Sequence, residues 1–233
     1  NYPFRDAVCD FLTCRTDAYA LYETLSGQRE RYPEPFYGAC MNLLGSHDTQ
    51  RILSCLSDAP PKDTLTREQQ AEYQYKPEAV VRGKRRLYAA FALMFSMPQP
   101  PCIYYGDEAG MMGLSDPFNR GSYPWGREDI EIRSFVMRLS ALRRCNAALS
   151  SGKTAFAAPC ADAFAVLRCR GEESALTLVN RADHAVCAAL GAEDFREGPD
   201  ALNVRTADKY SDAFADGTVL QKDLGTGQIR VEI

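Results

Sequence analysis

His47 and Asp48 are adjacent residues whose side chains could act together on a polar substrate. They follow residues 39–44, a largely apolar run that is typical of a buried parallel strand. In closed parallel barrels the active-site groups lie where each strand meets the loop after it. An ionised carboxylate can accept hydrogen bonds from two hydroxyl groups at once, and an imidazole can donate to a third oxygen. Ser, Asp and Thr after a strand also cap helices, so these residue types alone leave both interpretations open.

A second apolar run, residues 102–105, also ends in polar residues, Gly106, Asp107 and Glu108. Because side chains adjacent in sequence point in different directions, we expect Asp107 and Glu108 to orient the loops at this rim rather than to form a catalytic pair. Between the two runs, residues 80–97 have helical period and become apolar nearly all round, which predicts a largely buried helix. The order strand, polar exit, helix therefore occurs twice.

Apolar spacing and capping residues predict three further helices and one long loop. They are a helix over 14–26 closed by Gly27, a short helix opening at Thr66 with Gln69 in a capping box, a Gly-, Pro- and Asp-rich loop over 110–127, and a helix from Ile132 to Asn146. Loops of this length inside a compact domain usually carry function.

After residue 150 the pattern changes to short strand-like runs separated by Gly, Asp and Asn. This predicts an α/β domain over 1–149 followed by an all-β domain, a β-sandwich, over 150–233. Residues 1–149 provide only two complete parallel strands, whereas a closed (β/α)8 TIM barrel needs eight. We therefore expect them to be part of a barrel. The strand-like runs of the second domain are 163–169, 174–180, 184–190 and 228–233.

The composition indicates a globular protein and argues against several classes of partner. Hydrophobic residues make up 45% of the 233-residue chain, and 27 basic against 31 acidic residues leave a net charge of −4, so nucleic acid is not an expected partner. No apolar stretch is long enough for a membrane span, and the amino terminus lacks the pattern of a signal peptide. The nine cysteines include no Cys-x-x-Cys pair, which predicts reduced thiols, no metal site and a cytoplasmic location.

Several motifs stand in an order and spacing that match one enzyme family. Residues 45–51 (Gly-Ser-His-Asp-Thr-Gln-Arg) and 101–111 (Pro-Cys-Ile-Tyr-Tyr-Gly-Asp-Glu-Ala-Gly-Met) are joined by 116–120 (Asp-Pro-Phe-Asn-Arg) and a Pro-Trp pair ending at Trp125. Together they resemble the last third of an α-amylase-family enzyme, glycoside hydrolase family 13, especially the neopullulanase, cyclomaltodextrinase and maltogenic amylase group. Residues 1–5 resemble the exit from its sixth barrel strand. The resemblance implies the carboxyl-terminal end of a (β/α)8 barrel followed by a β-sandwich.

The resemblance implies a retaining glycosidase with a carboxylate nucleophile, a carboxylic acid donor and an oxocarbenium-like transition state. In this family both groups follow the fourth and fifth strands, and no position of this chain matches either, so the isolated chain is expected to be inactive. Asp48 matches a third carboxylate that grips hydroxyl groups of the sugar being cleaved, and His47 matches its hydrogen-bonding neighbour. Asp116 and Arg120 resemble a pair that contacts a more distant glucose unit; a turn Asp beside a solvated Arg is the alternative.

The implied substrates are α-1,4-linked maltooligosaccharides, cyclodextrins or pullulan. Two alternatives stay open, a transglycosylase of the same family and a non-catalytic carbohydrate-binding or assembly module. No cofactor is expected, and although some family members bind calcium, its oxygen ligands are too common in this sequence to indicate a site. Exposed strand edges predict self-association of the chain, or pairing with the missing amino-terminal part of the barrel.

Trp125 and His184 have weaker predictions. Trp125 could stack on a sugar ring, but we expect it to be a hydrophobic plug beneath the long loop. His184 has no acidic or cysteine partner at ligand spacing, so we treat it as an ordinary surface or packing residue.

Overall fold

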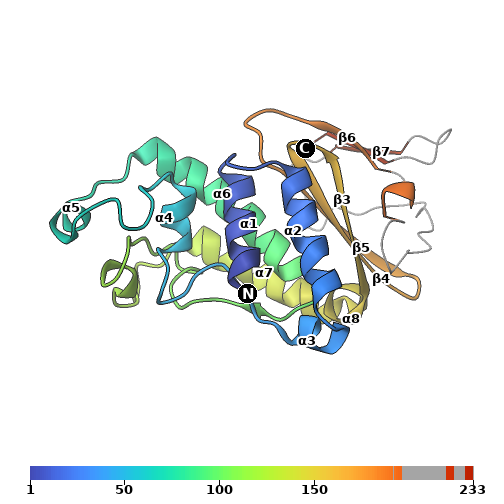
Figure 1. Cartoon of the computed structure of the whole chain (residues 1–233), viewed down its shortest axis with the longest axis horizontal. Coiled ribbons are helices and arrows are strands. Elements are labelled where there is room, and N and C mark those ends of the chain that lie inside the picture. Colours follow the sequence, from blue (N-terminus) through green and yellow to red (C-terminus); the bar gives the residue numbers. More distant parts are fainter. Residues whose placement is uncertain (191, 196–218, 223–228, 233) are drawn as a thin grey trace.

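The computed structural model describes residues 1–190, 192–195, 219–222 and 229–232, and most of its helices lie on one face of a β-sheet (Figure 1). The helices are α1 (Tyr2–Leu12), α2 (Ala18–Arg31), α3 (Glu34–Ala39), α4 (Ile52–Leu56), α5 (Arg67–Ala71), α6 (Pro77–Ser96), the 3-10 helix η1 (Phe118–Arg120), α7 (Ile130–Cys145), α8 (Ala147–Ser151) and the 3-10 helix η2 (Ala192–Phe195). The strands are β1 (Asn42–Leu43), β2 (Pro101–Cys102), β3 (Lys153–Cys160), β4 (Ala163–Arg170), β5 (Glu173–Asn180), β6 (Cys187–Leu190), β7 (Val219–Lys222) and β8 (Ile229–Glu232). Within these described ranges, no helix combines the length and apolar character needed to cross a membrane.

The two predicted parallel strands pair with each other, but both are short. Asn42 of β1 lies opposite Pro101 of β2, and Leu43 lies opposite Cys102, in the parallel direction. The predicted strand lengths are wrong, because Ala39 still belongs to α3 and residues 103–105 have left the ladder. A strand inside a parallel sheet pairs along both edges, whereas each of these has a single neighbour among the described residues.

Helix α2 differs most from its predicted bounds. It begins at Ala18 and continues past Gly27 to Arg31. A glycine inside a helix costs about 1 kcal/mol, and the complete burial of Leu21 and Leu25 outweighs that cost. Tyr32, the residue after the helix, is extended because a residue before proline avoids the helical region.

The other helices follow local signals. Helices α6 and α7 match the predicted apolar periods, and α5 opens with the predicted capping box, in which Thr66 and Gln69 each accept a hydrogen bond from the backbone N–H of the other. Helix α1 is an addition to the prediction. Its N-cap is Asn1, whose side chain accepts a hydrogen bond from the N–H of Phe4.

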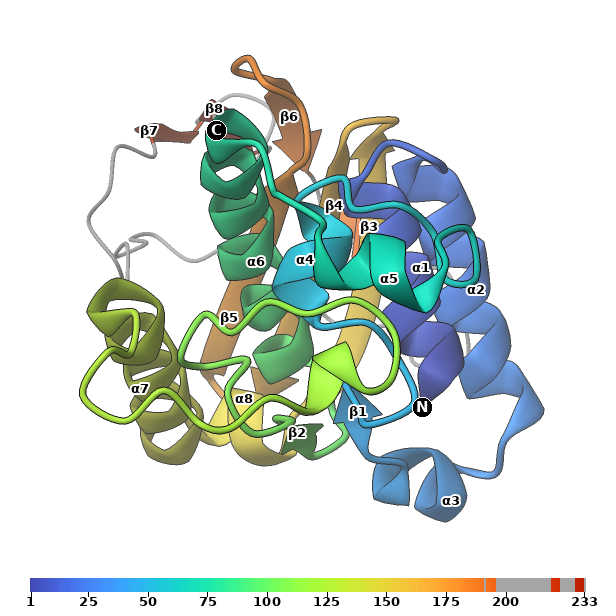
Figure 2. The same ribbon diagram turned by 90° about the vertical axis from the view of Figure 1, so that its left-hand side faces the viewer.

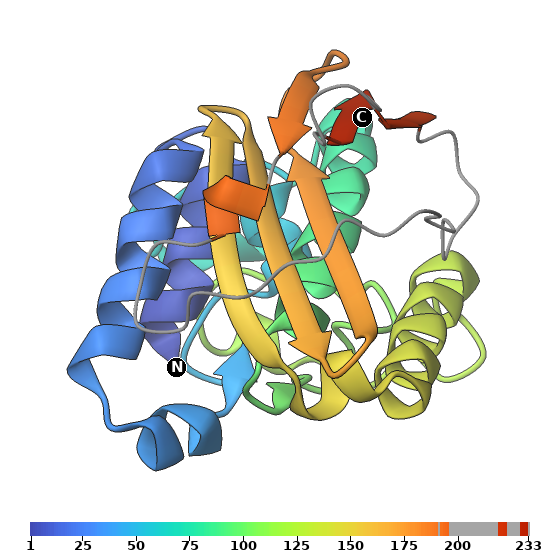
Figure 3. The same cartoon turned by 90° about the vertical axis from the view of Figure 1, so that its right-hand side faces the viewer.

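The antiparallel sheet β3–β4–β5 lies across the helices, with α1, α2 and α6 behind it in Figure 3. Its central strand β4 is buried on both faces. Phe164 and Val166 join the main hydrophobic core with the helices, and Ala165 and Leu167 join a smaller cluster on the opposite face. The four predicted runs correspond to β4, β5, β6 and β8, and β3 and β7 are additions; β6, β8 and β7 form a second antiparallel sheet.

The main core continues across residue 150. Buried side chains of α1, α2 and α6 belong to the same cluster as those of β3, β4 and β5. Arg168 of β4 also donates hydrogen bonds to the carbonyl oxygens of Ser96, at the end of α6, and of Gly152, both at 2.8 Å. The division into domains at 150 stays a prediction, and the packing shows that the sheet and the helices depend on each other.

Candidate functional site

His47 and Asp48 lie in a turn formed by residues 45–49, directly after β1, and we call this the His47–Asp48 turn. The backbone N–H of Asp48 donates to Oγ of Ser46 at 3.1 Å, and the N–H of Ser46 donates to Oγ1 of Thr49 at 3.1 Å. Ser46 and Thr49 thus stabilise the turn on either side of His47 and Asp48 by bonds between side chain and backbone. The turn is therefore closed by its own side chains.

Groups distant in sequence hold this turn in place. Asn119, which is fully buried, donates to the carbonyl oxygens of His47 at 2.9 Å and of Thr49 at 2.7 Å. Arg5 of α1 donates to the carbonyl oxygen of Leu44 at 3.0 Å. The 110–127 loop that carries Asn119 thus lies against the turn, on the side of the molecule that shows β1 and β2 (Figure 2).

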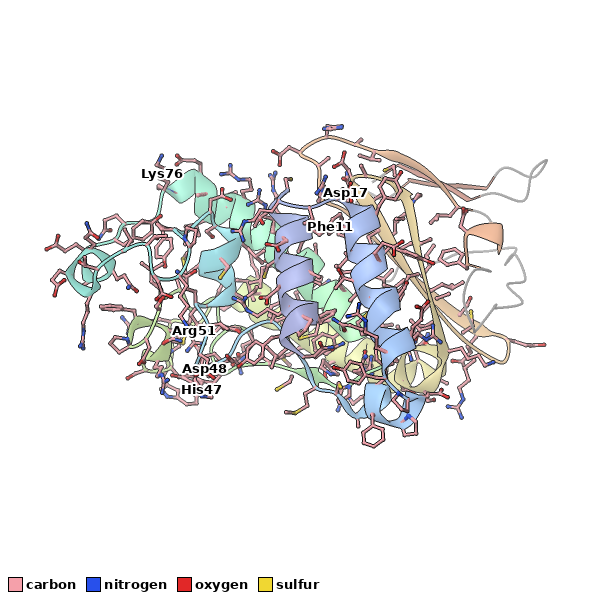
Figure 4. All side chains as sticks on the ribbon, viewed as in Figure 1. Phe11, Asp17, His47, Asp48, Arg51 and Lys76 are labelled. Atoms are coloured by element: carbon pink, nitrogen blue, oxygen red, sulfur yellow. The ribbon has the colours of Figure 1, made fainter. Side chains whose placement is uncertain are left out.

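The side chains of His47 and Asp48 lie together and face solvent. Nε2 of His47 is 3.3 Å from Oδ1 of Asp48, and the two side chains are 61% and 62% exposed. Figure 4 shows them beside each other, far from Phe11 and Asp17 at the other end of α1 and α2. A carboxylate and an imidazole held side by side on a rim can accept and donate hydrogen bonds to the same polyhydroxyl ligand.

Asp116 and Arg120 lie on the loop that packs against the turn. Nε of Arg120 is 2.9 Å from Oδ1 of Asp116, and both side chains are about half exposed. The pair brackets the buried Asn119 in sequence, so the same segment that supports the turn also presents these two side chains. An exposed ion pair contributes about 0–1 kcal/mol, so a ligand could replace it at little cost.

A buried ion pair lies beneath the exposed groups. Nη1 of Arg51 is 3.2 Å from Oδ1 of Asp107, and neither side chain has appreciable contact with solvent. Desolvation by burial raises the pKa of Asp107 to about 7, while the positive charge of Arg51 opposes the shift. This agrees with the predicted orienting role of Asp107, and no charge of the pair is available to a substrate.

The raised pKa of Asp107 predicts a pH dependence of stability. The folded chain holds this proton between pH about 4 and 7, where an unfolded Asp has lost it. The contribution of Asp107 is therefore fully present below pH about 4 and is lost as the pH rises through about 7. In urea denaturation at several pH values, the free energy of unfolding of the native chain should fall from pH 4 to 8 relative to that of Asp107→Asn.

Asp58 provides a control with the opposite sign. Partial burial opposes the shift, but hydrogen bonds from Arg82 and Arg86 lower the pKa of Asp58. Its contribution to the free energy of unfolding is present above pH about 4 and is lost as the pH falls. The free energy of unfolding of Asp58→Asn should therefore lie furthest below that of the native chain at neutral pH. Parallel stability curves for the native chain and Asp107→Asn would contradict the assigned shift.

The structure corrects one sequence prediction and adds two residues to the site. Trp125 is no plug, because it is 80% exposed, with its ring centroid 4.6 Å from that of Tyr123. His184 is exposed, as expected. Arg51 and Asn119 both lie within the recognised motifs, and the structure adds that both are fully buried and that Asn119 bonds to the His47–Asp48 turn. A buried Asn in a polar loop carries no signal of its own in the sequence.

Other features of the described residues lie away from this rim. A cavity of about 570 Å³ opens between α2, α3 and the amino terminus, and Gln28, Tyr32 and Tyr37 are among its lining residues. Across the described part of the chain, no three His, Cys, Asp or Glu side chains cluster closely enough to hold a metal ion. The cysteines whose side chains the structure describes are free thiols.

Comparisons with known proteins give a consistent set of relatives, although no family model matches the chain. It is 39% identical over 163 residues to an amylopullulanase from Thermoanaerobacter thermohydrosulfuricus, which covers 65% of this chain and 10% of that protein. It is 30% identical over 191 residues to a cyclomaltodextrinase from Geobacillus thermopakistaniensis (strain MAS1), which covers 79% of this chain and 28% of that protein. The chain thus spans less than a third of the length of these relatives.

The fold also resembles solved enzymes. One is the cyclic α-maltosyl-(1→6)-maltose hydrolase from Arthrobacter globiformis in complex with cyclic α-maltosyl-(1→6)-maltose. The TM-score is 0.66 at 28% sequence identity, and the alignment covers 84% of this chain and 39% of that one. Sequence and structure comparisons therefore agree on the kind of protein that this chain resembles.

Proposed function

Because this chain belongs to the α-amylase family of glycoside hydrolases, we propose that the protein containing it hydrolyses α-1,4-linked maltooligosaccharides, cyclodextrins or pullulan with retention of configuration. The observation that carries the proposal is the placement of His47 and Asp48, adjacent and exposed after β1 and against the 110–127 loop. The names of the relatives support the substrate class, since they include an amylopullulanase and cyclomaltodextrinases. The α-glucan oligosaccharide is the proposed partner.

In the proposed mechanism Asp48 accepts hydrogen bonds from two hydroxyl groups of the sugar whose bond is cleaved. Its charge also stabilises the positive charge that develops on the ring in the transition state. His47 donates a hydrogen bond to the same sugar. The nucleophile and the acid come from residues outside this chain, and together with Asp48 they complete the reaction centre.

Asp116 and Arg120 form a second contact region in this proposal. Their ion pair is exposed and lies on the segment that Asn119 fixes to the turn, so a glucose unit bound there shares one rim with the unit held by Asp48. Trp125 and Tyr123 present adjacent aromatic rings on the same loop. An exposed indole can stack on the apolar face of a sugar, and the exposure of Trp125 favours that role over the plug.

The proposed layout is the carboxyl-terminal part of a (β/α)8 barrel over 1–149 and a β-sandwich over 150–233. Large apolar side chains are exposed near β1 and α3, among them Phe36 at 70% and Met41 at 58%. We propose that the rest of the barrel covers them in the full-length protein, and that the isolated chain associates with itself through them. Free thiols and the intracellular maltogenic amylase of Bacillus subtilis among the relatives support a cytoplasmic location.

An activity assay on two proteins tests the proposal. The full-length protein should release sugars from cyclodextrins and maltooligosaccharides, and the 233-residue chain should release none, because it lacks the two groups that make and break the glycosidic bond. Products are separated by chromatography. Transfer products in place of free sugars would identify a transglycosylase, and binding without turnover by the full-length protein would identify a non-catalytic module. Turnover by the short chain would disprove the assignment of the missing groups.

A further inference from the structure

The exits of β1 and β2 are joined beneath the His47–Asp48 turn by Arg51 and Asp107. Nη1 of Arg51 donates both to Oδ1 of Asp107, at 3.2 Å, and to the carbonyl oxygen of Tyr105. The guanidinium carbon also lies 4.3 Å from the ring centroid of Tyr104 and 4.6 Å from that of Tyr105. The side chain of Arg51, which follows β1, is therefore enclosed by four groups of the segment after β2. They are the carboxylate of Asp107, the carbonyl of Tyr105 and the rings of Tyr104 and Tyr105.

The backbone of Arg51 is fixed as well. Its N–H donates to the carbonyl oxygen of Gly113 at 3.0 Å, and its carbonyl oxygen accepts from the N–H of Cys55 in α4 at 3.1 Å. The N–H of Gly113 in turn donates to Oγ of Ser54 at 2.8 Å. Arg51 thus connects the turn, the 110–127 loop, α4 and the exit of β2.

Asp107 controls the first residue of the turn by close contact. A Cβ atom at Gly45 would lie only 2.1 Å from Oδ2 of Asp107, so the carboxylate occupies the space that any larger residue would need. Because Asp107 is held by Arg51 and enclosed, it cannot move aside freely. The position of this carboxylate therefore limits where the chain can leave β1.

We propose that Arg51 and Asp107 are positioning residues, whose buried pair sets the orientation of His47 and Asp48 and thereby the affinity of the site for its sugar; the second half of this claim rests on the proposed function. A buried ion pair is weak support for stability alone, because apolar residues of similar volume often do as well. The guanidinium of Arg51, by contrast, bonds two oxygens through Nη1 while its plane lies over the rings of Tyr104 and Tyr105. The geometry of the pair suits positioning.

The two histidines of the chain allow a test that does not depend on catalysis. Ring 1H–13C spectra of the 233-residue chain at pH 8, above the pKa of about 7 of Asp107, report on His47 at the site and on His184 as an internal control. Arg51→Met and Asp107→Asn should each move the His47 signal by more than its linewidth and leave the His184 signal in place. Arg51→Lys should not restore the native position, since an ammonium group has no plane to stack on the rings of Tyr104 and Tyr105.

Arg168→Met is the matched control, because Arg168 is equally buried but bonds to Ser96 and Gly152, away from the turn. It should lower the melting temperature without moving the His47 signal. An unmoved His47 signal in folded Arg51→Met and Asp107→Asn, equal movement in Arg168→Met, or unfolding of both pair variants would each overturn the positioning role. The spectra contain no sugar, so a failure of the proposed enzymatic function would leave this result unaffected.

Discussion

Asp48→Asn in the full-length protein should lower kcat/KM on maltooligosaccharides and cyclodextrins by about 10²- to 10⁴-fold. A hydrogen bond to a charged group contributes about 1.5–3 kcal/mol, and Asp48 is proposed to make two of them in the transition state. Since about 1.4 kcal/mol corresponds to a factor of ten, two such bonds give the expected range. The amide keeps the size of the side chain but has one acceptor oxygen and no charge. Initial rates at low substrate concentration measure the effect.

A matched control separates this loss from general damage. Asp10→Asn removes another exposed carboxylate, which pairs with Arg15 at 3.1 Å near the far end of α1. It should leave kcat/KM unchanged within about a factor of two. The loss of kcat/KM in Asp116→Asn should lie between these two, at about tenfold. The Asp116–Arg120 pair is proposed to bind a glucose unit that is distant from the bond being cleaved. Full activity in Asp48→Asn would remove Asp48 from the mechanism.

The candidate site residues could be proposed from the sequence because they occur in contiguous motifs. His47, Asp48, Asp116 and Arg120 each stand in a short segment that resembles a motif of the α-amylase family. Their supports were not predictable in the same way. Arg51 reaches Asp107 across 56 residues, and Asn119 reaches the carbonyl of His47 across 72. Apolar spacing and turn residues report local structure, whereas such contacts depend on how distant segments pack.

The fold shows the same contrast between local and distant effects. Helices α6 and α7 follow from apolar period, and α5 follows from its capping box. The end of α2 depends on the packing of Leu21 and Leu25, which overrides the glycine signal at 27. Trp125 is exposed although a lone tryptophan in a loop suggested burial. A sequence pattern indicates whether a segment prefers helix, turn or burial, and tertiary contacts decide whether the folded chain follows that preference.

The end of α6 shows how one distant side chain can decide local structure. Arg143 of α7 donates to the carbonyl oxygens of Phe95 at 2.7 Å, Met97 at 2.6 Å, and Pro98 and Gln99 at 3.2 Å each. The last carbonyls of a helix have no partner within the helix, and a cation there also interacts favourably with the helix dipole. Arg143 therefore fixes the segment that leads from α6 into β2.

Arg143→Met should lower the free energy of unfolding of the 233-residue chain by about 2–4 kcal/mol. Four carbonyl oxygens lose a charged donor in this variant. Burial of the cation costs free energy in the native chain and lowers the pKa of Arg143. Because the variant avoids that cost, part of the loss is offset. The melting temperature should fall by about 4–16 °C, at 2–4 °C per kcal/mol for a chain of this size. Arg144→Met, on the exposed neighbouring residue, should change it by less than about 2 °C. Equal melting temperatures for the two variants would mean that water replaces the guanidinium at the end of α6. In that case the link from α6 to β2 would be held by the hydrophobic core alone.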